Sequence, residues 1–214
     1  MANIAETVTR ICDDLSRPEG EIGDVVQREI LSAISFYESK RLVFNERVVT
    51  ASLSLTNQYS FSSLVANESG VEDIIAIDSI KVSDGSREYE LERSNWRDMF
   101  SLDSLAAAAS FPDYWSTFNK TLRLYPTPNQ TLTAYITAHV KLDTLLGASG
   151  ATENAWLQEG EELIRTRATG MVLSRKLDDF EKATVYRAME TDALRRMLYD
   201  AHVGRSTGIL SANP

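Results

Sequence analysis

Three pairs of adjacent carboxylates come closest, in type and spacing, to residues that could do catalytic chemistry. Two opposed carboxyl groups can act as acid and base, or as acid and nucleophile, across a glycosidic bond. Each pair falls in a stretch of helical character, where neighbouring side chains point roughly 100° apart. The carboxylates of a pair should therefore diverge, and compensation of helix dipoles accounts for two of the three pairs. The pairs are Asp13-Asp14, Glu161-Glu162 and Asp178-Asp179.

Histidine and cysteine offer few further candidates for a base, a nucleophile or a metal ligand. The histidines are His139, on the polar face of an expected strand, and His202, near the C-terminal end. We expect both to be ordinary surface histidines. The single cysteine, Cys12, lies beside Ile11 on an expected helical face, and we interpret it as a small buried hydrophobe. One cysteine excludes an intrachain disulfide and a cysteine metal cluster.

Motifs and overall charge narrow the function classes further. Neither a glycine-rich phosphate loop nor a Gly-x-Ser-x-Gly turn can be drawn from the sequence, so we predict no cofactor and no catalytic residue. The net charge is −9, which repels nucleic acid and argues against sequence-specific DNA binding, although DNA could still slide past such a surface. No apolar run approaches the ~18 residues of a membrane span. The N-terminus lacks the features of a secretion signal, so we expect the protein to begin in the cytoplasm, without membrane contact.

The longest segment of helical character runs over residues 152–200, without a proline. Its apolar residues recur at close to the helical period, and Asp178-Asp179 suits a helix start, which predicts a helical hairpin or a jointed long helix. Its charges interleave, as on a solvated face that carries local pairs such as Glu161 with Arg165 and Lys176 with Asp179. The alternative is a subunit interface with complementary charges. The candidates for such an interface are Glu161, Arg165, Arg167, Arg175, Asp192, Arg195 and Arg196.

Two further helices are predicted at the N-terminus. Residues 3–15 carry apolar side chains at helical spacing, and residues 22–44 continue a similar stripe that should pack on the helices after residue 152. Between them, Ser16 and Glu19 have the spacing of a capping box that would begin the second helix near Pro18.

The hydrophobic period changes to two after Arg47, which predicts strands. Asp84-Gly85 and Asn119-Lys120 favour tight hairpin turns, and successive strands joined by such turns form antiparallel sheets. Residues 96–109 suit a short helix or a packed loop. The expected strands cover residues 47–55, 74–82, 88–91, 114–118, 121–125 and 131–142.

The predicted fold is therefore α+β, a helical bundle with an inserted antiparallel β domain. Residues 1–46 and 144–200 would form the helical body, and residues 47–143 the β insertion. Residues 201–214 are rich in glycine and small polar residues, which predicts a flexible C-terminal tail.

This order of elements resembles the head-to-tail adaptor proteins of tailed bacteriophages. The likeness rests on Phe36-Tyr37-Glu38-Ser39-Lys40-Arg41-Leu42-Val43-Phe44-Asn45-Glu46 after the second helix, and on Leu122-Arg123-Leu124-Tyr125-Pro126-Thr127-Pro128 before an alternating strand. It covers residues 1 to about 200, and its motifs are structural rather than catalytic.

The resemblance implies a non-enzymatic virion protein at the head-tail neck, which assembles in the host cytoplasm. Such proteins form a homo-oligomeric ring, commonly of twelve copies, beneath the capsid portal protein, and they receive the tail or a further connector protein while leaving a channel for DNA. Their C-terminal extension reaches the portal. The portal-binding candidates in this chain would be Arg205, Ser206, Thr207, Ile209 and Leu210.

Three alternatives remain open from the sequence. The chain could be a tail-side neck or tail-completion protein, a cell-wall hydrolase used in DNA entry, or an unrelated α+β interaction module, because a fold does not fix a function.

Overall fold

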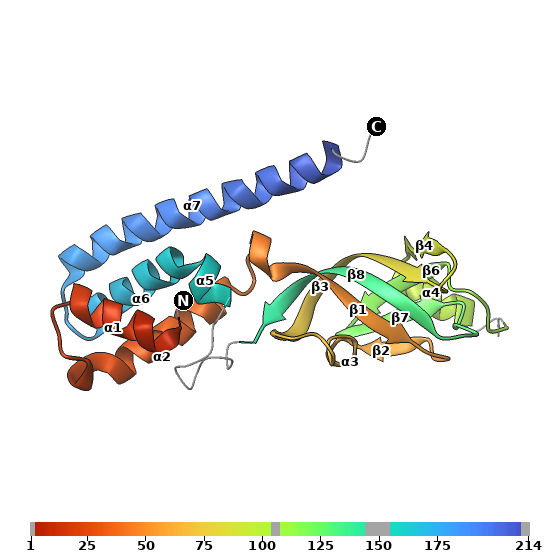
Figure 1. Cartoon of the computed structure of the whole chain (residues 1–214), viewed down its shortest axis with the longest axis horizontal. Coiled ribbons are helices and arrows are strands. Elements are labelled where there is room, and N and C mark those ends of the chain that lie inside the picture. The colour runs from red at the N-terminus through yellow and green to blue at the C-terminus, as the bar shows by residue number, and fades with distance from the viewer. Residues whose placement is uncertain (1–2, 104–107, 144–154, 211–214) are drawn as a thin grey trace. The chain divides into compact units, whose positions relative to one another are not determined.

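The computed structural model describes residues 3–103, 108–143 and 155–210. It divides the chain into two compact units (Figure 1). Unit 1 joins Met1–Phe44 to Asp143–Pro214, and unit 2 is Asn45–Leu142. The α+β fold class predicted from the sequence is confirmed.

Unit 1 is helical. Its helices are α1 (Ile4–Asp14), α2 (Glu19–Tyr37), α5 (Ala155–Glu159), α6 (Glu161–Arg175) and α7 (Phe180–Leu210). Helix α6 packs against α2 and α7, as the apolar stripes predicted for α2 and α6. A short 3-10 turn, η1 (Val43–Asn45), follows α2, which ends at Tyr37 rather than continuing toward Phe44. The core of the unit contains Ile11, Ile22, Val26, Ile30, Ile34, Trp156, Leu157, Leu163, Ile164 and Val172.

The observed ends of α1 and α2 show that the predicted capping box at Ser16 is wrong. The Asn3 side chain caps α1 by accepting a hydrogen bond from the Glu6 backbone N–H at 2.9 Å. Ser16 does not cap α2, because the N-cap position of α2 belongs to Pro18 and no side chain caps it. Ser16 instead has φ +52°, and its N–H donates to the Asp13 carbonyl at 2.9 Å, which closes the end of α1.

Helices α6 and α7 form the predicted hairpin, joined at Asp178 and Asp179. Asp178 has φ +52°, and the Asp179 carboxylate accepts a hydrogen bond from the Lys182 backbone N–H at 3.1 Å in the first turn of α7. That backbone hydrogen bond, followed by the bond and ion pair to the Lys182 side chain, holds the pKa of Asp179 below its usual value. The predicted helix start at this position is confirmed.

The expectation of a flexible tail from residue 201 is corrected for residues 201–210, which form the last turns of α7. No proline interrupts these residues, and a glycine disfavours a helix interior by only ~1 kcal/mol relative to alanine. Extending an existing helix also avoids the nucleation cost. Residues 211–214 lie outside the described part of the chain.

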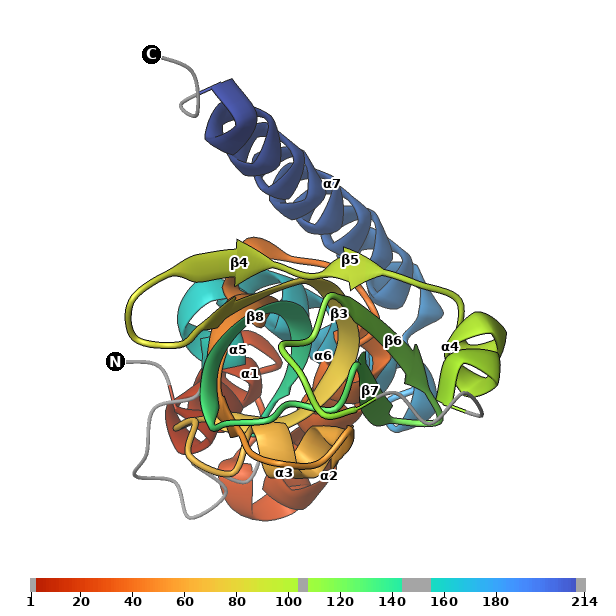
Figure 2. The same ribbon diagram turned by 90° about the vertical axis from the view of Figure 1, so that its right-hand side faces the viewer.

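Unit 2 contains two four-stranded sheets with the orders β1-β8-β3-β4 and β2-β7-β6-β5. Figure 2 shows β4 and β5 as successive stretches of one segment that passes from the first sheet to the second. Two short helices, α3 (Phe61–Leu64) and α4 (Trp96–Asp103), complete the unit. The strands are β1 (Glu46–Leu53), β2 (Gln58–Ser60), β3 (Val71–Ser83), β4 (Glu88–Glu90), β5 (Glu92–Arg93), β6 (Tyr114–Phe118), β7 (Thr121–Tyr125) and β8 (Leu132–Leu142).

Both predicted hairpins are present. Strands β3 and β4 pair from Ser83 opposite Glu88, with Gly85 at φ +91° in the turn, and β6 and β7 pair around Asn119 and Lys120, both at positive φ. The other pairings are also antiparallel, except that β5 runs parallel to β6. Parallel neighbours need a long connection, and β5 and β6 are joined by the segment that contains α4 rather than by a hairpin.

Strand β8 lies between β1 and β3, and this position corrects the expectation of a surface His139. Along most of β8, buried and exposed residues alternate as predicted. At its C-terminal half, Ala138, His139 and Val140 are all buried, so both faces of the strand are covered there. Period-two alternation cannot reveal cover on the second face. His139 therefore belongs to the interior of unit 2.

Candidate interaction surfaces

The pairs of carboxylates do not assemble into an acid-base site. Glu161 pairs with Arg10, Glu162 with Arg196 at 2.6 Å, and Asp179 with Lys182 at 3.2 Å. Asp14 lies 3.9 Å from Arg165. These carboxylates therefore balance neighbouring cations, as the divergent geometry of the pairs predicted.

Cys12, the one thiol, is buried in α1 with an exposed fraction of 2%. Burial, reinforced by the nearby Glu19 and Asp13 charges, raises the pKa of this thiol. A raised pKa disfavours the thiolate, which is the nucleophilic form. The interpretation of Cys12 as a small buried hydrophobe is confirmed.

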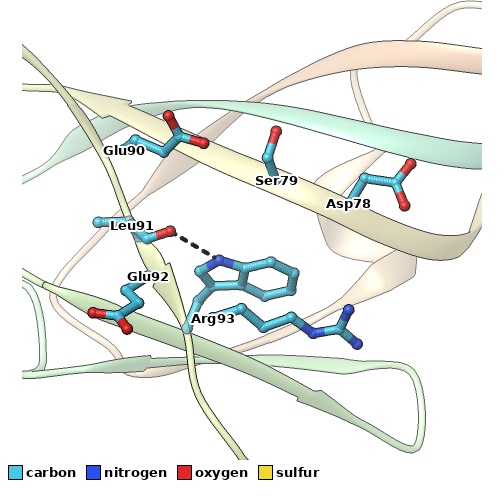
Figure 3. A pocket seen from close by; sticks show the side chains of 7 residues that line it. Asp78, Ser79, Glu90, Leu91, Glu92 and Arg93 are labelled. Atoms are coloured by element: carbon cyan, nitrogen blue, oxygen red, sulfur yellow. Dashed lines mark hydrogen bonds between the residues drawn. The ribbon is translucent and has the colours of Figure 1, made fainter. Parts of the chain in front are cut away.

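An open pocket of about 480 Å³ in unit 2 contains further carboxylates. Figure 3 shows Glu90 and Glu92 on opposite sides of Leu91, with their carboxylates directed apart. The Trp115 indole N–H donates to the Leu91 carbonyl at 3.1 Å, and the Arg93 guanidinium lies 5.3 Å from the centre of the same ring. These contacts fix the segment between the two sheets, and the carboxylates do not face a common point.

Helix α7 packs on α6 through a seam of small side chains. Ala183, Ala193 and Ala201 are buried along one side of α7. A Cβ added to Gly170 of α6 would lie 3.4 Å from the Tyr186 Cβ, so the two helices approach closely at this point. The seam fixes which face of α7 is turned away from the helical body.

A cluster of three polar side chains joins α2, α6 and α7 beside that seam. The Arg167 Nη1 donates to the Glu190 Oε1 at 2.7 Å, and the Tyr37 hydroxyl donates to the same oxygen. The Arg167 and Glu190 side chains are only 17% and 16% exposed, and the guanidinium lies 3.5 Å from the centre of the Phe36 ring. Burial, and then the hydrogen bond to Glu190, raise the pKa of Tyr37. The cluster fixes α7 to the body by charge as well as by packing.

The residues predicted as subunit-interface candidates lie on α6 and α7, and all seven form ion pairs within the chain. The predicted local pairs of Glu161 with Arg165 and of Lys176 with Asp179 are replaced by pairs to other partners, because docking of α1 and the turn before α7 bring those partners closer. The observed pairs are Glu161 with Arg10, Arg165 with Asp14, Arg167 with Glu190, Arg175 with Glu29, Arg196 with Glu162, and Arg195 with Asp192.

The outer face of α7 combines exposed apolar residues with two of those candidates. Val185 is 57% exposed and Tyr199 is 68% exposed. Ala188, Asp192 and Arg195 are exposed between them, at spacings of three and four residues that place all five on one side of the helix. This is the side opposite the alanine seam.

The residues predicted to bind a portal fall on the last turns of α7. These residues are Arg205, Ser206, Thr207, Ile209 and Leu210; the backbone is helical there, and their side chains lie outside what the structure describes. The 31 residues of α7 span ~46 Å, about twice the length of the 15-residue α6. Burial of α7 residues on the body is described as far as Ala201.

Unit 2 has an aromatic cluster that was not predicted from the sequence. Phe100 on α4 is 66% exposed and Phe118 on β6 is 61% exposed. The Trp96 ring lies 5.4 Å from that of Phe118, and the buried Arg123 guanidinium lies 5.5 Å from the rings of both Trp96 and Phe100. Two exposed aromatic side chains beside one cluster make this region a candidate contact surface. The sequence signal was the density of aromatic residues on both sides of residues 101–113.

Exposed apolar and charged residues are thus present on both units. The model of the SU10 adaptor protein family matches residues 2–211, and the chain belongs to this family. The resemblance to phage head-to-tail adaptor proteins is thereby confirmed. The family is one of bacteriophage structural proteins that interact with other phage structural proteins. The comparison with curated proteins gives no match.

Within the described ranges, no helix is both long enough and apolar enough to cross a membrane.

Proposed function

We propose that this protein forms a homo-oligomeric ring beneath the capsid portal protein and joins it to the tail, with a channel for DNA. The observation that carries the proposal is the family match over residues 2–211. In the portal-bound state the ring has twelve copies, as in the head-to-tail adaptors that the sequence resembles. A net charge of −9 suits a DNA conduit, because a negative lumen repels phosphate and lets the duplex slide.

In this proposal the C-terminal turns of α7 contact the portal. Arg205, Ser206 and Thr207 would supply polar contacts, and Ile209 and Leu210 the apolar anchors. The fixed seam between α6 and α7 supports this role, because it gives those turns a defined direction. A pre-formed helix also loses less conformational entropy on docking than a flexible tail would.

The outer face of α7 and the charged side of α6 would then contact neighbouring subunits. Asp192 and Arg195 support this assignment best, because both are exposed and lie between Val185 and Tyr199. The other predicted candidates would contribute by exchanging an intrachain ion pair for one between subunits. The aromatic cluster of Phe100 and Phe118 would contact a tail or connector protein.

Sedimentation of the protein with its portal tests the proposal. Full-length protein should sediment with the portal, and native mass spectrometry of the complex should show twelve copies. Removal of residues 204–214 should weaken attachment, while the melting temperature of the helical unit stays within about 2 °C, because the ends of a chain generally contribute little to stability. A flexible Gly/Ser sequence of equal length in place of these residues is the matched control. If the full-length, truncated and Gly/Ser-substituted proteins attach equally, the C-terminal turns do not bind the portal. If the full-length protein does not attach at all, the adaptor ring is refuted.

A further inference from the structure

Two adjoining cavities form one groove on unit 1, beside the C-terminal half of α7. The larger, of about 370 Å³, is lined by Leu42, Val43, Phe44, Glu159, Met197 and Asp200. The smaller, of about 200 Å³, shares Glu159, Met197 and Asp200 with it and extends to Leu163 and Arg196. We call these two cavities together the α7 groove.

The floor of the α7 groove is apolar and well supported. Leu42 is fully buried, and the Phe44 ring packs edge-on against Trp156 with 4.9 Å between ring centres. Val43 is nevertheless 59% exposed, although it lies between these two anchored residues. A rigid backbone that presents an exposed aliphatic side chain suits an apolar anchor from another segment.

The rim of the α7 groove is acidic. Arg196 pairs with Glu162 at 2.6 Å, so these two charges offset each other. Glu159 and Asp200 are exposed, and neither forms an ion pair with a residue that the structure describes. The rim therefore has two uncompensated negative charges beside an apolar floor. The complementary occupant combines apolar side chains with a positive charge.

The C-terminal segment of the chain has this composition. Over residues 203–214, Arg205 is the only charged side chain, and Ile209 and Leu210 are large aliphatic residues. The segment cannot reach the groove of its own chain, because α7 continues as a helix from Asp200 to Leu210. At ~1.5 Å per residue, Ile209 lies ~13 Å beyond Asp200 along the helix axis. This segment could therefore enter only the groove of a second copy.

We propose that the C-terminal segment of one copy of this protein docks in the α7 groove of a second copy. Ile209 and Leu210 pack over Val43 and Phe44, and Arg205 lies between Glu159 and Asp200. The proposed function assigns the same segment to the portal, and on that basis the groove holds the segment until the portal displaces it. The docking itself is tested without a portal.

A peptide of residues 201–214, with blocked ends and a fluorescent label, is the probe. Its anisotropy is measured during titration with the full-length protein. Saturable binding is expected, with a Kd on the order of 10–100 µM, as suits a small interface. The Glu159→Lys/Asp200→Lys protein should bind at least about tenfold more weakly. An Asp24→Lys protein, altered at an exposed carboxylate of α2 outside the groove, should bind like the wild type.

Exchanging the charges of the peptide and the protein makes the test specific. An Arg205→Glu peptide should bind the wild-type protein poorly and regain affinity for the Glu159→Lys/Asp200→Lys protein. A lack of saturable binding up to about 1 mM, or equal loss of affinity in the Asp24→Lys control, would overturn the proposal. The groove variant should still sediment with the portal, because its own C-terminal segment is intact, so groove docking and portal attachment can fail separately.

Discussion

The cluster of Arg167, Glu190 and Tyr37 provides the sharpest test of how α7 is held on the helical body. Glu190→Leu removes the carboxylate that accepts hydrogen bonds from the Arg167 Nη1 and the Tyr37 hydroxyl. Because both charged side chains are more than four-fifths buried, the substitution leaves a largely desolvated guanidinium without its counter-charge. Loss of one partner of a buried pair costs about 3–5 kcal/mol. The remaining stacking of Arg167 on Phe36 places the expected loss near the lower limit, about 3 kcal/mol.

Thermal unfolding measured by circular dichroism at the helix band is the assay. A loss of about 3 kcal/mol should lower the Tm of the helical transition by about 6–12 °C. Arg167→Met combined with Glu190→Leu should recover much of that loss, because no unpaired charge then remains buried. Arg195→Met is the matched control on α7, because Arg195 and Asp192 are 76% and 69% exposed; it should change stability by less than about 0.5 kcal/mol. A Tm change below about 2 °C for Glu190→Leu, or a double variant no more stable than the single one, would refute the reasoning.

Three smaller predictions follow from local geometry. Asp179→Ala should destabilise the start of α7 in urea denaturation, because it removes the carboxylate that accepts the Lys182 backbone N–H. Because the folded-state pKa of Asp179 is lowered, the difference from wild type should be full above pH ~4 and vanish as the pH falls through the folded-state value. Gly160→Ala should destabilise the protein, because the added Cβ would lie 2.9 Å from the Trp156 carbonyl oxygen. Gly20→Ala should stabilise it by about 0.5–1 kcal/mol, because nothing lies within 4 Å of the added Cβ. A rise in Tm for Gly160→Ala and a fall for Gly20→Ala would contradict both predictions. Burial raises the pKa of Tyr59 to about 12, so the free energy of unfolding of the wild type should fall as the pH rises from ~10 toward that value. A Tyr59→Phe protein whose stability falls equally steeply with pH would contradict this.

Local sequence patterns predicted the longer helices and strands, because these elements have a clear period. They did not indicate β2 and α3, which are too short to show one. The packing of α6 on α2 followed from two apolar stripes that each need a partner. The prediction of a capping box at Ser16 was wrong, because the same residue types occur at the end of one helix and at the start of the next. Only the backbone shows that Ser16, at φ +52°, belongs to the end of α1.

The contacts that matter for function depend on tertiary docking, and the sequence could not supply them. Arg10 pairs with Glu161, which lies 151 residues further along the sequence, whereas local spacing favoured a pair of Glu161 with Arg165. The α7 groove combines Val43, Glu159 and Met197 from three distant segments, which no local pattern brings together. The portal-binding candidates from Arg205 to Leu210 came from the resemblance and remain a prediction.

A cryo-electron microscopy reconstruction of the protein bound to its portal tests the central claim most directly. A ring of twelve copies should lie beneath the portal, with the C-terminal turns of α7 in contact with it and a channel through the centre. Portal particles without such a ring, when the protein is present in excess, would refute the proposed function.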